Sequence, residues 1–152
     1  MTELRVPTVS LPAAVLCSDG QRLTGHVFVP AAASRHPGPT RPDEWLNEAD
    51  AFFPFQADGA PRPVILNKRQ VLSLSLSADP ADAGRAGAPR ERRVSIELGP
   101  HRFEGTVMID MPENRSRVLD VLNRDEDFVT LHSGSEWHLI QKRSITRVAE
   151  LA

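Results

Sequence analysis

The stretch "VILNKRQVLSLSL" (Val64 to Leu76) returns in altered form near the end of the chain as "HLIQKRSITRVAEL" (His138 to Leu151). Each version contains an aliphatic pair, a side-chain amide, the pair Lys-Arg and then a run of aliphatic or β-branched residues. Internal similarity of this kind is typical of an architecture built from repeated units. The two versions predict that the 152 residues contain two copies of one structural unit.

Two further pairs of segments match in the same order along the chain. The aligned segments are Val15–Pro30 with Ser95–Asp110, and Thr40–Phe55 with Ser116–Leu131. In the first pair Gly25 falls on Gly105, and in the second pair Asn47 falls on Asn123. Three matching blocks in one order predict a tandem duplication.

Between the two copies lies the segment "SADPADAGRAGAPRER", which is rich in Ala, Gly, Pro and charge and has no apolar periodicity. Such a composition is typical of a flexible linker. The predicted organisation is a first unit over residues 1–76, a linker over 77–92 and a second unit over 93–152.

Each copy has the pattern of short strands around one short helix. Apolar residues alternate in the strands, as in Val94, Ile96 and Leu98, which is the period of a half-buried strand. Gly25 and Gly105 lie inside the second strand of each copy, where a glycine usually marks a bulge or a sharp bend.

The helix of each copy is expected between its second and third strands. Thr40 and Ser116 are the expected N-cap residues, and the helices are expected to end near Asn47 and Asn123. A short-stranded unit of this size is stabilised best as a strongly bent barrel, because a flat sheet leaves two long open edges. The predicted fold class is mainly β, with two tandem small five-stranded β-barrels.

This pattern resembles the Sm-like and SH3-like small barrels. In both copies a turn joins two strands, a glycine interrupts the second strand, and an apolar pair followed by a basic residue precedes the last strand. In the Sm family the last hairpin carries an Ile-Arg-Gly element that contacts RNA bases. The matching places here are Leu66-Asn67-Lys68-Arg69 and Ile140-Gln141-Lys142-Arg143, and neither has the glycine.

Composition narrows the classes of partner. The formal net charge is -2, which disfavours nucleic acid or an anionic membrane as an obligatory partner. Cys17 is the only cysteine, so an internal disulfide is excluded. The sequence has no apolar span of about 18 residues for a membrane helix, and its first residues lack a signal-peptide core. We expect a cytoplasmic protein without a membrane partner.

Two sets of residues are candidates for binding. The first comprises the basic residues of the repeated corner, which could hold a phosphate or an acidic segment or could simply be exposed. These residues are Lys68, Arg69, Lys142 and Arg143. The second set is Trp45 and Phe53, which form either a hydrophobic docking patch or an inward-facing helix lid.

The sequence offers only weak candidates for metal-binding or catalytic residues. His132 and His138 flank a short loop that also contains Glu136, but no helix carries a zinc-binding pair of histidines. Ser133 and Ser135 lie in the same region, without a nucleophile elbow around either. We expect no catalytic residue, no metal and no cofactor.

These features predict a non-enzymatic binding or scaffold module that acts through protein–protein contacts. The alternative is an Sm-like RNA-binding or regulatory protein. The strand near Leu72–Leu76 has no charged residue to protect its edge, so it is the expected docking site for the sister copy or for another chain. A homo-oligomer is a further expectation.

Overall fold

Ten strands form one antiparallel sheet in the computed structural model, which describes residues 7–33, 36–77, 90–109 and 117–151. The prediction of a mainly β protein is confirmed. The strands of the N-terminal half are β1 (Thr8–Cys17), β2 (Arg22–Pro30), β3 (Phe52–Ala57), β4 (Val64–Asn67) and β5 (Val71–Ser77). Those of the C-terminal half are β6 (Arg90–Leu98), β7 (His101–Ile109), β8 (Phe128–Ser133), β9 (Glu136–Gln141) and β10 (Arg147–Glu150).

The two halves have the same order of strands within the sheet. The N-terminal half runs β5-β1-β2-β3-β4, and the C-terminal half runs β10-β6-β7-β8-β9. A helix follows the second strand of each half and a 3-10 turn precedes the last strand. These elements are α1 (Pro42–Leu46), α2 (Val118–Leu122), η1 (Lys68–Gln70) and η4 (Lys142–Ser144).

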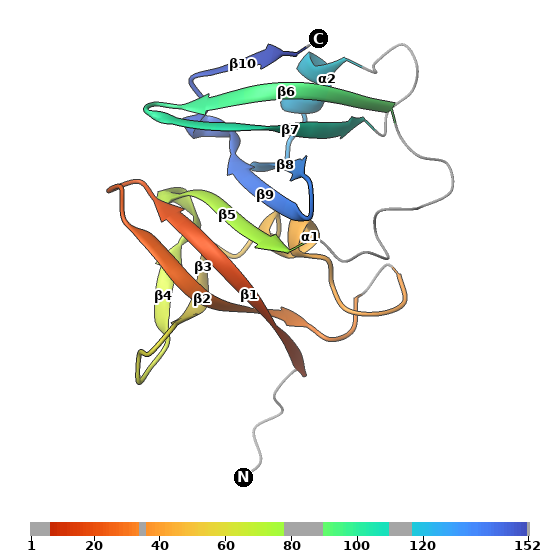
Figure 1. Ribbon diagram of the computed structural model, residues 1–152. Coiled ribbons are helices and arrows are strands. Elements are labelled where there is room, and N and C mark those ends of the chain that lie inside the picture. The colour runs from red at the N-terminus through yellow and green to blue at the C-terminus, as the bar shows by residue number, and fades with distance from the viewer. Residues whose placement is uncertain (1–6, 34–35, 78–89, 110–116, 152) are drawn as a thin grey trace.

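The halves are joined edge to edge by β5 and β9, which meet between them in Figure 1. The pairing is antiparallel and places Leu74 opposite Leu139 and Ser75 opposite His138. The expectation that the strand near Leu72–Leu76 is a docking edge is confirmed, and the strand that it pairs with belongs to the C-terminal half. The strands β4 and β10 are then the outer strands of the sheet.

Strands extend into both ends of the predicted linker. Ser77 belongs to β5 and lies opposite Glu136, while Arg90 begins β6 and lies opposite Ile109 of β7. The start of β6 has a run of exposed, charged residues, so apolar alternation could not reveal it. The remainder of the predicted linker lies outside the described residues.

Gly25 and Gly105 allow the next strand to approach closely. A Cβ atom on Gly25 would lie 2.0 Å from the carbonyl oxygen of Gln56, and one on Gly105 would lie 2.4 Å from that of His132. Only glycine permits such an approach of two backbones. At these places β2 pairs with β3, and β7 with β8, over a short register only.

The first hairpins of the two halves differ by one residue. The β1–β2 turn runs through Ser18, Asp19 and Gly20, whereas the β6–β7 turn runs through Gly99 and Pro100. The sequence alignment pairs Val15 with Ser95. The strand register instead places Val15 level with Ile96, since Val15 lies opposite Leu23 and Ile96 lies opposite Phe103.

The helices begin one residue later than the sequence indicates. Arg41 and Arg117 are the N-cap residues, and their backbone N–H groups donate to the carboxylates of Glu44 and Asp120. The N–H of Thr40 donates to the carbonyl of Pro30, so Thr40 belongs to the end of the strand region. Ser116, the other predicted N-cap, lies outside the described residues.

Two hydrophobic clusters fill the two halves, and the first is built from both halves. Its N-terminal members include Trp45, Leu46 and Leu74, and these pack with residues of β8 and β9. The C-terminal members of this shared cluster are Phe128, Trp137 and Leu139. The halves therefore share a core as well as a sheet.

Candidate functional site

The two lysines of the repeated corner point at the ends of the helices. The Nζ atom of Lys68 donates to the carbonyl of Glu48 at 3.1 Å, and that of Lys142 donates to the carbonyls of Val121 and Arg124 at 3.3 and 3.1 Å. The carbonyls at a helix C-terminus carry partial negative charge and lack partners within the helix, so an ammonium group stabilises them. Each lysine thus connects the corner before the last strand of its half to the end of the helix.

Burial lowers the pKa of both lysines. For Lys68 the desolvation is opposed by the carboxylates of Asp50 and Glu48, which favour the charged form. For Lys142 it is opposed chiefly by Glu126. Of the three donors of each ammonium group, Lys142 uses two and Lys68 one in these bonds to backbone carbonyls.

The structure brings the two Lys-Arg corners together at the junction of the halves. The side-chain Nε2 of Gln141 donates to the carbonyls of Lys68 and Arg69, each at 3.0 Å. Arg69 and Arg143 are both exposed. Of the four basic residues predicted as a clamp, the two arginines are therefore the ones that solvent reaches best.

Trp45 and Phe53 form the inward-facing lid rather than an exposed docking patch. They are 8% and 3% exposed, and their rings meet edge to face with centroids 5.2 Å apart. The helix α1 covers the end of the N-terminal core and turns Trp45 inward. Phe53 shares this inner face with Phe55, two residues further along the strand.

The exposed apolar surface lies instead on the outer edge of the N-terminal half. Phe52 is 57% exposed and Ile65 is 73% exposed, and Val64 beside them is exposed as well. They belong to β3 and β4, which pair with each other at the end of the sheet. Their signal in the sequence is the alternation in β3: once Phe53 and Phe55 are assigned to the core, Phe52 must face the other way.

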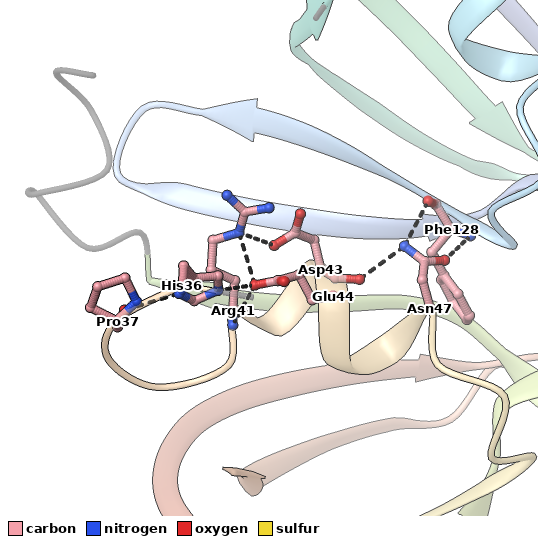
Figure 2. A network of polar contacts seen from close by, with 7 residues as sticks. All are labelled: His36, Pro37, Arg41, Asp43, Glu44, Asn47 and Phe128. Atoms are coloured by element: carbon pink, nitrogen blue, oxygen red, sulfur yellow. Dashed lines mark hydrogen bonds and ion pairs between the residues drawn. The ribbon is translucent and has the colours of Figure 1, made fainter. Parts of the chain in front are cut away.

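A polar network surrounds the start of α1, as Figure 2 shows. Arg41 Nε lies 3.2 Å from the Glu44 carboxylate and 3.4 Å from that of Asp43, and His36 Nε2 also contacts Glu44. Burial raises the pKa of Asp43, while the guanidinium of Arg41 opposes this shift. The network fixes the start of the helix.

At the other end of α1, Asn47 bridges to the C-terminal half. Its Oδ1 accepts the backbone N–H of Phe128 at 2.9 Å, and its Nδ2 lies 3.4 Å from the Phe128 carbonyl and 2.9 Å from that of Asp43. One side chain thus satisfies both backbone groups of Phe128, in the way a neighbouring strand would. Asn47 is the side chain that attaches α1 to β8 (Figure 2).

The two histidines considered for chemistry are separated, although the Glu136 carboxylate lies 3.8 Å from His138 Nε2. In the β8–β9 register His132 lies opposite Trp137 whereas His138 lies opposite Leu131, so the two histidines occupy different faces of the sheet. His138 Nδ1 is 2.6 Å from the hydroxyl of Ser75. Among the residues that the structure describes, no group of three His, Cys, Asp or Glu side chains could hold a metal ion.

Cys17 has none of the features of an activated thiol. It is only partly exposed, and burial together with the charge of Asp19 raises the pKa of its thiol. A thiol becomes a strong nucleophile when its pKa is lowered, so the environment acts in the opposite direction.

Comparisons of the chain with protein-family models, with curated proteins and with solved structures find no match. In the described part of the chain, neither α1 nor α2 has the length and hydropathy needed to cross a membrane.

Proposed function

We propose that the chain is a non-enzymatic binding or scaffold module of the cytoplasm, which acts through protein–protein contacts and needs no cofactor. In this proposal each half is a small, strongly curved barrel of the Sm-like or SH3-like kind, and the two arose by tandem duplication. The shared strand order of the halves and the close approach of the next strand at Gly25 and Gly105 support this architecture.

The observation that carries the proposed function is the outer edge formed by β3 and β4. Phe52 and Ile65 share one face there, Val64 is exposed on the other face, and β4 is the last strand of the sheet on this side. The unpaired backbone groups of an outer strand are a template for adding another strand, and large exposed apolar side chains beside it mark a site of protein–protein contact. Binding by strand addition combines backbone hydrogen bonds with apolar anchors of this kind.

The test is recovery of partners with the wild-type chain and with two variants as bait. Ile65→Asp places a charge in the centre of the edge, and Gln21→Glu adds the same charge at an exposed turn of β1–β2. The proposal expects a polypeptide that wild type and Gln21→Glu recover equally and that Ile65→Asp recovers at least about tenfold less, which corresponds to about 1.4 kcal/mol. Equal recovery with all three baits would count against it.

The second candidate function is RNA binding, which the exposed Arg69 and Arg143 at the joined corners favour. A fluorescence titration with mixed oligonucleotides over a series of salt concentrations tests it. Sub-micromolar affinity that falls with salt and is lost in the double variant Arg69→Ala, Arg143→Ala would replace the first candidate with the second. The double variant Arg22→Ala, Arg62→Ala removes the same charge elsewhere and is the matched control.

A further inference from the structure

The exposed apolar residues of the outer edge have buried counterparts in the C-terminal half. We define counterparts by strand register. Phe52 lies opposite Asn67, and Phe128 lies opposite Gln141, so Phe128 is the counterpart of Phe52. Ile65 and Leu139 stand two residues before Asn67 and Gln141, so they are counterparts as well. Phe128 and Leu139 are 3% and 0% exposed. The same two positions are therefore exposed in one half and covered in the other.

The N-terminal half provides that cover. Phe128 and Leu139 belong to the shared cluster with Trp45, Leu46 and Leu74, so α1 and β5 enclose them. The cover has three parts: β5 pairs with β9, α1 packs on β8, and Asn47 bonds the backbone of Phe128.

The C-terminal half carries the same three parts, and they face outward. The strand β10 is the counterpart of β5 and is an outer strand of the sheet. Beside it, α2 borders a groove of about 540 Å³. Its lining is aliphatic at Val118, Leu119, Leu122 and Val148 and charged at Arg92, Arg117 and Glu150. Leu119 is 56% exposed, and Asn123, the counterpart of Asn47, is also exposed.

The exposed large hydrophobic side chains of the described chain all lie on these two surfaces. Phe52 and Ile65 lie on one face of the outer edge of the N-terminal half, and Val64, opposite Phe55, lies on the other face of that edge. Leu119 lies at the groove beside α2. Phe52 and Ile65 are the counterparts of Phe128 and Leu139, which the junction buries. The groove includes Leu122 and Val148, the counterparts of Leu46 and Leu74, which help to cover the junction. The two surfaces are therefore complementary in the way that the halves already are.

We propose that the chain associates head to tail with further copies of itself, repeating between chains the junction that joins its halves. In this contact β4 of one copy pairs antiparallel with β10 of the next. Ile65 then lies opposite Val148, in the same way that Leu139 lies opposite Leu74 at the junction of the halves. Phe52 and Ile65 enter the groove beside α2, and the amide of Asn123 binds the backbone of Phe52. The inference rests on the proposed function and names the partner.

Of the two charged residues on β10, Glu150 lines the groove and Arg147 is directed away from the contact. Arg147 Nε forms an ion pair with the Glu97 carboxylate of the neighbouring strand at 2.8 Å, so this side chain lies across β6 rather than over the outer edge. Each copy uses two different surfaces, so the contact is heterologous and leads to a closed ring or an open filament.

Sedimentation velocity of the full chain over about 1–100 μM tests the proposal. We expect masses that are multiples of 16.8 kDa and that increase with concentration. Ile65→Asp and Leu119→Glu, both at exposed positions, should each weaken association at least about tenfold while the circular dichroism spectrum stays unchanged. Gln21→Glu should associate as wild type does.

A mixing experiment distinguishes head-to-tail contact from a symmetric dimer. The Ile65→Asp chain keeps an intact groove and the Leu119→Glu chain keeps an intact outer edge, so the mixture should form one-to-one complexes that grow no further. A mixture that stays monomeric, or a wild-type chain that is monomeric at about 100 μM, would overturn the inference. If the monomeric wild type still recovers a different protein through Ile65, the proposed function stands and only the self-association fails.

Discussion

Gly25 shows how much of this fold depends on the absence of one carbon atom. The Gly25→Ala variant would place a Cβ within 2.0 Å of the Gln56 carbonyl oxygen, and a backbone atom cannot move aside as a flexible side chain could. We expect the free energy of unfolding to fall by about 1–3 kcal/mol or more, as for other overpacked sites. Urea unfolding measures it, and Thr24→Ala, at the exposed neighbouring position, should change it by less than about 0.5 kcal/mol.

Asn47 and Asn123 provide a matched pair for the bridge between the halves. Asn47→Ala leaves the backbone N–H of the buried Phe128 without its partner, which costs about 1–3 kcal/mol. Asn123→Ala changes the counterpart on the exposed surface and should cost much less in a dilute sample, where chains are separate. Equal losses in the two urea curves would contradict the role assigned to Asn47.

At the scale of elements, the strands can be predicted from the sequence because a half-buried strand preserves apolar alternation whatever surrounds it. The start of β6 cannot, since the exposed residues of Arg90–Arg93 carry no such alternation. Which of Phe52 and Phe53 is exposed depends on which face of β3 packs against the core. The alternation in β3 does not by itself identify that face.

The candidate site is harder to predict than the strands. The repeated Lys-Arg pairs are visible in the sequence, but a side chain as long as that of Lys68 can turn inward to a helix end that the sequence does not place nearby. The groove beside α2 has no local signal at all, because it is defined by α2 and β10, which are far apart along the chain.

The β5–β9 junction should respond to acid through His138. Burial lowers the pKa of His138, and the nearby Glu136 carboxylate only partly opposes this. Between that lowered pKa and the usual value of about 6.5, the unfolded chain binds more protons than the folded one, so the free energy of unfolding rises with pH in this window. Stability should therefore decrease as the pH falls below about 6.5.

Urea unfolding at several pH values measures this effect. His138→Gln should reduce the slope of stability against pH in this window. Ser75→Ala removes the hydroxyl partner but retains the burial, so most of the slope should remain. An unchanged slope in His138→Gln would show that another group causes the acid sensitivity.

For the molecule as a whole, the shared core predicts a single unfolding transition. Trp45 lies in the N-terminal half and Trp137 in the C-terminal half, yet both belong to one hydrophobic cluster. Fluorescence of the single-tryptophan variants Trp137→Phe and Trp45→Phe should each report the same urea midpoint as the circular dichroism of that variant. A fluorescence midpoint that departs from the circular dichroism midpoint in either variant would mean that the halves unfold independently.

The shared cluster also has a consequence during synthesis on the ribosome. The chain emerges from its N-terminus, so Trp45, Leu46 and Leu74 leave the exit tunnel well before Phe128, Trp137 and Leu139, which complete their packing. In that interval β5 is an unguarded edge, of the kind that pairs with other nascent chains on the same polysome. Slow translation of the segment before β8 would prolong this exposure, so codon choice there should affect the yield of folded protein.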